Sequence, residues 1–273
     1  MQSKTLNILT KGDVKYITFP KLQDRNEIRH IFSTRLGGVS EGRYKSMNLS
    51  FNNGDNRENV LENYKIICDC AGININNLVL SKQTHTNNVM IVDESHRGTG
   101  IFKKEFSDID GLITNCPGVA LVTQYADCTP LLFFDPVKKV IASSHAGWRG
   151  TALEIGRVTI EKMHEHFGCS PENIIAGIGP CIGNCCYEVD DPVYNAYKEI
   201  SYLNLDKVFT KKTNGKYMLD NAMANFEILV NAGIKPENID VSDICTNCNA
   251  DELHSHRATK GERGNLAAFI ELK

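Results

Sequence analysis

The sequence has no long apolar segment and almost no excess of charge of either sign. Its 273 residues contain no run of about 18 apolar residues, the length that a membrane-crossing helix needs. Residues 1–10 lack the apolar core of a secretory signal peptide. Lysine and arginine number 30 against 33 aspartate and glutamate, whereas a general nucleic-acid binder has a basic excess. We therefore expect a cytoplasmic protein with neither a membrane nor a nucleic acid as its partner.

Internal repeats, low-complexity runs and linkers rich in proline or serine are also missing. Hydrophobic residues make up 41% and charged residues 23% of the chain, which excludes the composition typical of disorder. A chain of this length forms one large domain or two small ones. Because the composition stays even, we predict a single domain over residues 1–273, as a monomer or a homodimer.

The apolar pattern predicts strands and helices in alternation. Apolar residues at helical spacing predict helices over 55–71, 151–166 and 218–232. Shorter apolar runs predict strands at 28–32, 78–80, 89–93, 118–123, 130–135, 139–144, 174–178 and near Ile239. Nearly continuous apolar runs are typical of strands that are buried on both faces. The alternation predicts an α/β fold in which helices cover a sheet.

Ten cysteines are many for a chain without signs of secretion. They are better interpreted as buried thiols, metal ligands or catalytic groups than as a disulfide framework. Cys245-Thr-Asn-Cys248 precedes His254 and His256, and such a pair can bind zinc, although this spacing is tighter than in zinc fingers. Cys181-Ile-Gly-Asn-Cys185-Cys186 is interpreted mainly as a turn, or as part of the wall of a site.

Three potential metal ligands lie at or beyond the ends of predicted strands. His85 lies in a polar segment between two strands. Cys128 follows Asp127 between two buried strands, and His145 ends a third. Two imidazoles and a thiolate suffice to bind zinc and leave a fourth position open, as catalytic sites do. The same residues also fit a cysteine nucleophile with a histidine base. Asp127 would orient a ligand or carry a proton.

Two arginines are candidate ligands for an oxyanion. Arg149 follows Gly147 and Trp148 immediately before a predicted helix, where backbone N–H groups and the helix dipole favour anions. The segment lacks the G-K-[ST] ending of a Walker loop. Arg35 precedes a pair of glycines in a polar loop, and its planar guanidinium matches the oxygens of phosphate. We predict that both arginines bind phosphate or a similar group.

Taken in order, the motifs of the chain resemble those of the YfiH family, also called PgeF-like or polyphenol oxidoreductase (laccase-domain) proteins. The motifs that carry the resemblance are Phe32-Ser-Thr-Arg-Leu-Gly-Gly-Val-Ser40, Ser46-Met-Asn-Leu49, Gln83-Thr-His85, Asp110-Gly-Leu-Ile-Thr114, Ala126-Asp-Cys-Thr-Pro130, His145-Ala-Gly-Trp-Arg-Gly150, Gly179-Pro-Cys-Ile182, Tyr187-Glu-Val189 and Cys245-Thr246. The chain departs from the family at Ser255-His256-Arg257, where Ser-Tyr-Arg is common, and at Gly261-Glu-Arg-Gly264, where Gly-Arg is common.

This resemblance implies a single-domain α/β/α sandwich with a mixed sheet. It also implies a metal site at His85, Cys128 and His145, with zinc as the expected ion and copper as a possible one. The implied activities are phosphorolysis of adenosine, inosine and methylthioadenosine, and deamination of adenosine. The partners would then be a nucleoside and phosphate, with Asn48, Arg35 and Arg149 as substrate-binding residues.

Two other activities are associated with the family. One is editing of peptidoglycan precursors, for which Cys128 would be the nucleophile of a hydrolase. The other is copper-dependent oxidation of polyphenols. A four-copper oxidase needs roughly ten histidines, by the number of imidazole ligands of its copper ions. This chain has 8 histidines, which favours a single metal ion over a full laccase site.

Overall fold

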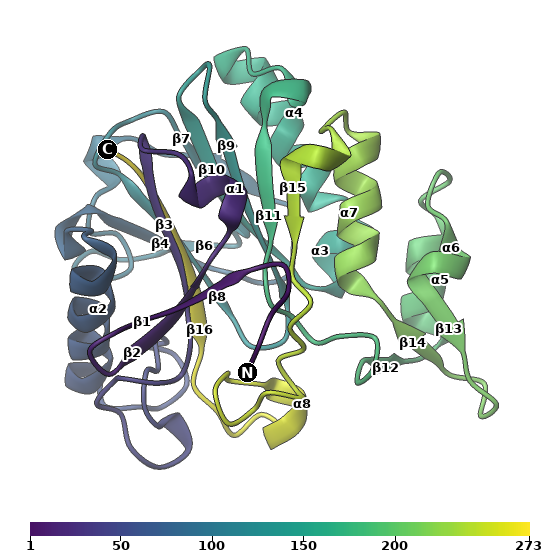
Figure 1. The fold of residues 1–273 in the computed structure, drawn as a ribbon, viewed down its shortest axis with the longest axis horizontal. Helices are drawn as coiled ribbons and strands as arrows, with labels where there is room; N and C mark the ends of the chain where they lie inside the picture. Colours follow the sequence, from purple (N-terminus) through teal and green to yellow (C-terminus); the bar gives the residue numbers. More distant parts are fainter.

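Two mixed sheets lie at the centre of the computed structural model, which describes all residues, 1–273 (Figure 1). The strands of the first sheet are β1 (Asn7–Lys11), β2 (Val14–Thr18), β3 (Ile28–Ser33), β4 (Leu78–Lys82), β6 (Phe106–Ser107), β8 (Ala120–Tyr125) and β16 (Leu266–Leu272). The strands of the second sheet are β5 (Val89–Ile91), β7 (Gly111–Thr114), β9 (Thr129–Asp135), β10 (Val140–Ala146), β11 (Ile175–Ile178) and β15 (Ile239–Val241).

Most neighbouring strands in both sheets are antiparallel. The first sheet has the order β1-β2-β3-β16-β8-β4-β6, with parallel pairing at β8-β4 and β4-β6. The second has the order β15-β11-β9-β10-β7-β5, with parallel pairing at β15-β11 and β7-β5. The helices are α1 (Pro20–Gln23), α2 (Arg57–Ala71), α3 (Trp148–Ala152), α4 (Ile155–Phe167), α5 (Asp191–Lys198), α6 (Leu205–Val208), α7 (Asn221–Asn231) and α8 (His256–Thr259).

Consecutive apolar residues build cores on opposite faces of each sheet. Leu132 and Phe134 of β9 point into the core between the two sheets, and Phe133 between them points toward α4 and α7. Leu121 of β8 likewise faces the core between the sheets, whereas Val122 faces α2. Successive side chains of a strand point to opposite faces, so a strand that is covered on both sides needs a continuous apolar run.

The layers are therefore helix, sheet, sheet and helix. The predicted α/β class is confirmed, and the middle of the sandwich consists of two packed sheets. A continuous apolar run shows that both faces of a strand are covered. It does not distinguish a covering helix from a covering sheet, so the second sheet was not evident from the pattern.

Two of the three predicted helices need correction. The helix predicted over 55–71 is confirmed as α2, which begins after the capping Asn56 and ends at Gly72, a residue with a φ of 68°. The single helix predicted over 151–166 is wrong, because α3 and α4 are separated at Glu154. The φ of 55° at this residue is incompatible with a continuous right-handed helix.

The third prediction, a helix over 218–232, begins too early. Residues Tyr217–Leu219 form strand β14, and the helix α7 starts only after Asp220, whose carboxylate accepts a hydrogen bond from the amide of Met223. Together with β12 (Glu188–Val189) and β13 (Phe209–Lys211), β14 forms a small third sheet that lies with α5 and α6 beside α7 (Figure 1). No helix of the structure has the length and apolar character required to cross a membrane.

Candidate metal centre and active-site cavity

His85, Cys128 and His145 meet where the chain passes from one sheet to the other. His85 lies in the connection from β4 of the first sheet to β5 of the second. Cys128 lies in the short connection from β8 to β9, which also joins the two sheets. His145 is near the end of β10, where it pairs with Pro130 at the start of β9. The ligand atoms of the three side chains all lie within 4.8 Å of one another, so the structure brings the predicted trio together.

Asp110 holds the loop of His85 and the ring of His145 through hydrogen bonds. Its buried carboxylate accepts hydrogen bonds from the amides of Thr84, His85 and Thr86, from the hydroxyl of Thr86 and from Nδ1 of His145. The bond to His145, at 2.8 Å, leaves Nε2 of that ring for a metal ion. Sequence reasoning assigned no role to Asp110, although the residue begins one of the motifs that carry the family resemblance.

The backbone is strained at two residues of the site. His85 has a φ of 67° and Asp127 a φ of 85°, and residues other than glycine rarely adopt such backbone conformations. Such strain costs about 1–3 kcal/mol per residue and is concentrated at functional sites. Gly147 completes the close packing: a Cβ atom there would lie 2.6 Å from Cδ2 of His85 and 3.2 Å from Sγ of Cys128.

The electrostatics favour charged forms of the buried groups. Burial alone would raise the pKa of Asp110, but the hydrogen bonds and charge of His145 lower it to about 2. Burial would likewise raise the pKa of Cys128, but His145 and His85 lower it to about 6. The pKa of His145 is raised to about 9, because the Cys128 thiolate and Asp110 outweigh the opposing effect of burial. These shifts favour a carboxylate at Asp110, a protonated ring at His145 and a thiolate at Cys128.

The donor set fits zinc or copper. Two imidazole nitrogens and one thiolate are ligands that both ions accept. Nε2 of His85 is 3.8 Å from Sγ of Cys128, close to the separation of about 3.5 Å between two ligands of one tetrahedral zinc ion. The hydrogen bond from Nδ1 of His145 to the carboxylate of Asp110 is the usual support of an imidazole that binds a metal through its other nitrogen. Three protein ligands leave a position open to a substrate.

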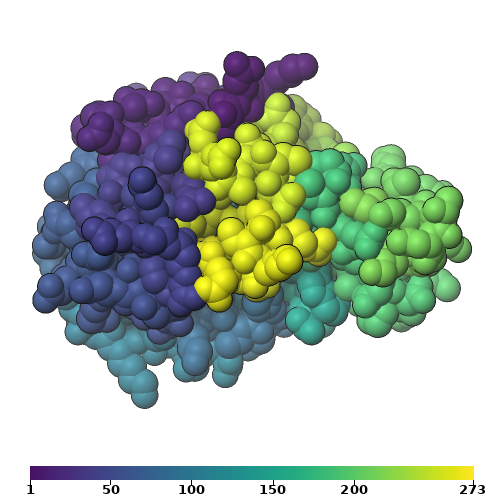
Figure 2. Space-filling view, turned by 90° about the horizontal axis from the view of Figure 1, so that it is seen from below, coloured from purple at the N-terminus to yellow at the C-terminus, as the bar shows by residue number.

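The trio lies in a cavity of about 750 Å³. This volume is within the usual range for small-molecule sites, which is about 300–1,000 Å³. Trp148, Tyr187 and Val193 contribute apolar surface to it, and Asp127 and Arg263 contribute polar groups. Figure 2 shows the C-terminal segment in yellow, which supplies Arg257 and Arg263 to the cavity wall, between the blue part of the chain and the green lobe that contains α5 and α6.

Asp127 is held in the cavity wall by two short hydrogen bonds. Its Oδ1 accepts a hydrogen bond of 2.6 Å from the hydroxyl of Thr246, and its Oδ2 accepts one of 2.6 Å from the amide of Arg257. The carboxylate is therefore fixed next to Cys128, with lone pairs left to accept a further hydrogen bond. This position is compatible with either role predicted for Asp127.

Three other predicted residues do not line the cavity. Arg35 donates hydrogen bonds to the carbonyl oxygens of Lys45 and Ala250 and so joins two loops. Arg149 is exposed, and its guanidinium stacks over Trp148 at 4.4 Å. Asn48 is completely buried, and its Oδ1 accepts a hydrogen bond from the amide of Asn265.

Two arginines that we did not predict do line the cavity. Arg257 donates hydrogen bonds to the carbonyl oxygens of Cys186 and Glu188. Arg263 is partly buried, and its Nε–H has no hydrogen-bond partner in the protein. Both residues follow the second sheet in the sequence but reach the site because β16 begins at the same edge where β8 ends. Because this segment departs from the family motif, the resemblance did not assign a role to Arg257 or Arg263.

The alternative zinc site considered from the sequence, in which Cys245 and Cys248 would combine with His254 and His256, is not formed. The side chain of His254 is buried away from both cysteines, and its Nε2 has no hydrogen-bond partner. Instead, the two cysteines gather with Cys185 and Cys186, which come from the segment interpreted as a turn.

The chain is similar to several known proteins over most of its length. The chain is 35% identical over 253 residues to purine nucleoside phosphorylase YlmD of Bacillus subtilis, covering 92% of this chain and 91% of that protein. It is 34% identical over 230 residues to adenosine deaminase RL5 of an unknown prokaryotic organism, covering 83% and 87%. The crystal structure of the hypothetical protein YfiH of Bacillus licheniformis superposes with a TM-score of 0.93 at 33% identity, covering 99% of this chain and 100% of that one.

The family model described as "Multi-copper polyphenol oxidoreductase laccase" matches residues 29–273. This range contains the strained loops, the three candidate ligands and Asp110. The resemblance to YfiH proteins that the motifs indicated is thereby confirmed, and the chain belongs to this laccase-like YfiH family.

Proposed function

We propose that the protein is a metal-dependent purine nucleoside enzyme that phosphorolyses adenosine, inosine and methylthioadenosine and deaminates adenosine. The observation that carries this proposal is the group of His85, Cys128 and His145 at an open cavity. It is supported by the names of the relatives, which are a purine nucleoside phosphorylase and an adenosine deaminase. A cavity of about 750 Å³ can hold a nucleoside together with phosphate.

When bound by the trio, zinc or copper would supply a Lewis acid that polarises an oxygen at the open position. The protein has three further tasks in phosphorolysis. Trp148 and Tyr187 offer aromatic faces against which a purine can stack. Arg263 binds phosphate, one oxygen of which bonds to C1′ of the ribose while the bond from C1′ to N9 breaks. Asp127 orients the nucleoside or carries the proton that the departing purine receives.

The same cavity would serve deamination. In that reaction water replaces the amino group on C6 of adenosine, so that inosine and ammonia are formed. Asp127 is the carboxylate in the cavity wall next to Cys128, and it is again the candidate for carrying a proton.

We also propose that the enzyme acts in the cytosol. All ten of its cysteines are free thiols, which suits a reducing compartment.

A product assay tests the proposed function. Zinc-loaded protein is incubated with adenosine in the presence and in the absence of phosphate, and the products are identified by mass. We expect free adenine and ribose 1-phosphate only when phosphate is present, and inosine in both conditions. If none of these products forms, the purine function is wrong, and peptidoglycan precursors become the substrates to examine.

Arg263 is expected to determine the affinity for phosphate. Hydrogen bonds to charged groups contribute about 1.5–3 kcal/mol, so Arg263→Gln should raise the KM for phosphate by about 10- to 150-fold. The measurement is the initial rate of adenine release at varied phosphate. Arg25→Gln, which removes an exposed arginine outside the cavity, is the matched control. A larger increase for Arg149→Gln than for Arg263→Gln would assign the anion to Arg149 and contradict our proposal.

A further inference from the structure

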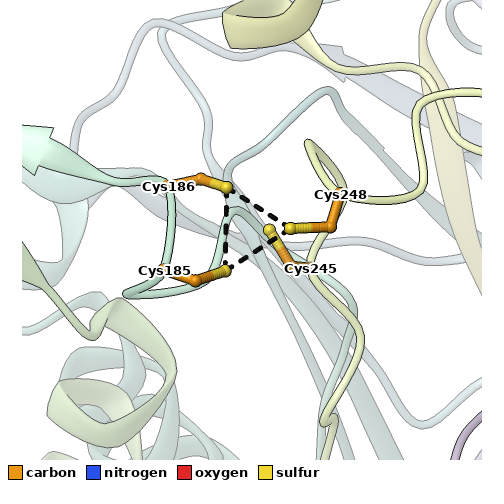
Figure 3. Close-up of side chains that lie close together, drawn as sticks. All are labelled: Cys185, Cys186, Cys245 and Cys248. Atoms are coloured by element: carbon orange, nitrogen blue, oxygen red, sulfur yellow. Dashed lines mark hydrogen bonds between the residues drawn. The ribbon is translucent and has the colours of Figure 1, made fainter.

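A second group of potential metal ligands lies outside the His85, Cys128 and His145 site. It consists of Cys185, Cys186, Cys245 and Cys248, whose sulfur atoms all lie within 4.8 Å of one another (Figure 3). The first pair lies between β11 and β12, and the second follows β15. Since β11 and β15 are parallel neighbours, the segments that follow them leave the sheet side by side.

Three of the sulfur atoms have separations close to those in a tetrahedral site, and the fourth, that of Cys245, lies within 4.8 Å of them. Sγ of Cys248 is 3.4 Å from that of Cys186 and 3.6 Å from that of Cys185, and the latter two are 3.7 Å apart. Four sulfur atoms at the zinc–sulfur distance of about 2.3 Å from a common centre are about 3.8 Å from each other. A disulfide would require about 2.05 Å, and all four residues are free thiols.

The surrounding backbone supports negative charge on the sulfur atoms. The amide of Gly183 donates a hydrogen bond of 3.2 Å to Sγ of Cys245, and such bonds stabilise thiolates that hold a metal. A Cβ atom at Gly183 would lie 3.2 Å from Cβ of Cys245 and 3.4 Å from Sγ of Cys185, so only glycine fits easily. The amide and side chain of Asn249 donate to the carbonyl of Cys245 and fix the turn of the Cys-x-x-Cys segment.

We propose that these four cysteines bind a structural zinc ion. Four thiolates from the protein close the coordination sphere, which is typical of structural zinc, whereas the three ligands at the cavity leave it open. The site would tie the segment of Ile182 and Tyr187, which line the cavity, to the segment whose Thr246 holds Asp127. Thr246, between the paired cysteines, holds Asp127, and the carbonyl of Cys186 accepts a hydrogen bond from Arg257.

Counting the metal ions bound to the 273-residue chain tests this proposal. The reduced wild-type protein, supplied with zinc, is examined by native mass spectrometry and elemental analysis. We expect two zinc ions per chain, of which Cys128→Ala loses one and Cys248→Ser loses the other. Cys116→Ser, which replaces a partly exposed cysteine outside both groups, should retain two. Exchange of the ion in Cys128→Ala for cobalt should give the intense charge-transfer absorption of a tetrathiolate site.

Several results would overturn the proposal. One is a wild-type chain with a single zinc ion that disappears in Cys128→Ala. Another is a Cys248→Ser variant that holds as much zinc as the wild type. Iron in place of zinc, or two fewer titratable thiols because a disulfide has formed, would also contradict it. Cys128→Ala retains all four cysteines of the proposed site, so its zinc content decides the question even if Cys248→Ser does not fold. None of these readouts depends on the purine activity.

Discussion

The Cys128→Ala variant is expected to lose the metal ion of the cavity and nearly all activity at the same time. The thiolate is the one sulfur ligand of the trio, and its sulfur is 3.8 Å from Nε2 of His85. A Lewis acid supplies several kcal/mol of transition-state stabilisation, so the rate of adenosine phosphorolysis should fall by at least about 1,000-fold. The measurements are zinc content and the rate of adenine release on the same preparation.

Cys116→Ala is the control for this variant, because its side chain is also partly exposed but lies outside both groups of ligands. It should retain the metal and the rate of the wild type. Full activity in a metal-free Cys128→Ala protein would reject the assignment of Cys128 as a metal ligand needed for catalysis.

Alkylation distinguishes a metal ligand from a nucleophile. In the metal-loaded protein we expect Cys128 to be protected from iodoacetamide. After chelation it should react, and the rate should rise with pH through a midpoint near its pKa of about 6, since the thiolate is the reactive form. An ordinary thiol would show this rise near pH 8.5. Rapid alkylation of the loaded protein with loss of activity would favour the alternative in which Cys128 is a hydrolase nucleophile.

The Asp110→Asn variant is expected to bind the cavity metal about 10- to 100-fold more weakly, the usual cost of removing a carboxylate that supports a metal-binding histidine. All five groups that contact this carboxylate donate hydrogen bonds to it. An asparagine would place an NH₂ group against some of these donors. It would also allow His145 to adopt the tautomer in which Nε2, the nitrogen that faces the metal position, carries the proton. Competition with a zinc chelator measures the affinity.

Asp108→Asn provides the matched control. This carboxylate is exposed and accepts a hydrogen bond from the hydroxyl of Thr84, but it does not contact His145. Its substitution should leave the affinity within about two-fold of the wild type, as expected for a surface position. Equal affinities for Asp110→Asn and the wild type would show that the pair of Asp110 and His145 does not support the metal.

The sequence permitted prediction of the group formed by the three candidate ligands, because their chemistry and their positions point the same way. His85, Cys128 and His145 are ligand types at the ends of apolar runs, and in α/β proteins such ends carry functional sites. Asp110 could not be assigned in the same way. A single carboxylate before a strand has no distinctive spacing, and its role depends on the loop at 84–86 folding back over it.

The four-cysteine group could not be predicted for a related reason. Cys245 and Cys248 form a recognisable pair, but their partners were sought in the histidines that follow. The true neighbours, Cys185 and Cys186, are brought to them by the parallel pairing of β11 and β15, which joins segments that are distant in the sequence. Local patterns do not contain that pairing. The two-sheet core was missed for the same physical reason.

The place of the last strand has a consequence for the synthesis of the protein. β16 lies in the middle of the first sheet, where residues 268–272 pair with β3 and residues 266–271 pair with β8. The ribosome synthesises β3 and β8 long before β16. Until residue 272 has emerged, the edge of each strand that pairs with β16 has no partner. Unpaired edges are open to association with other chains. The interval between the synthesis of Tyr125 and that of Leu272 is therefore the period in which the nascent chain most needs protection.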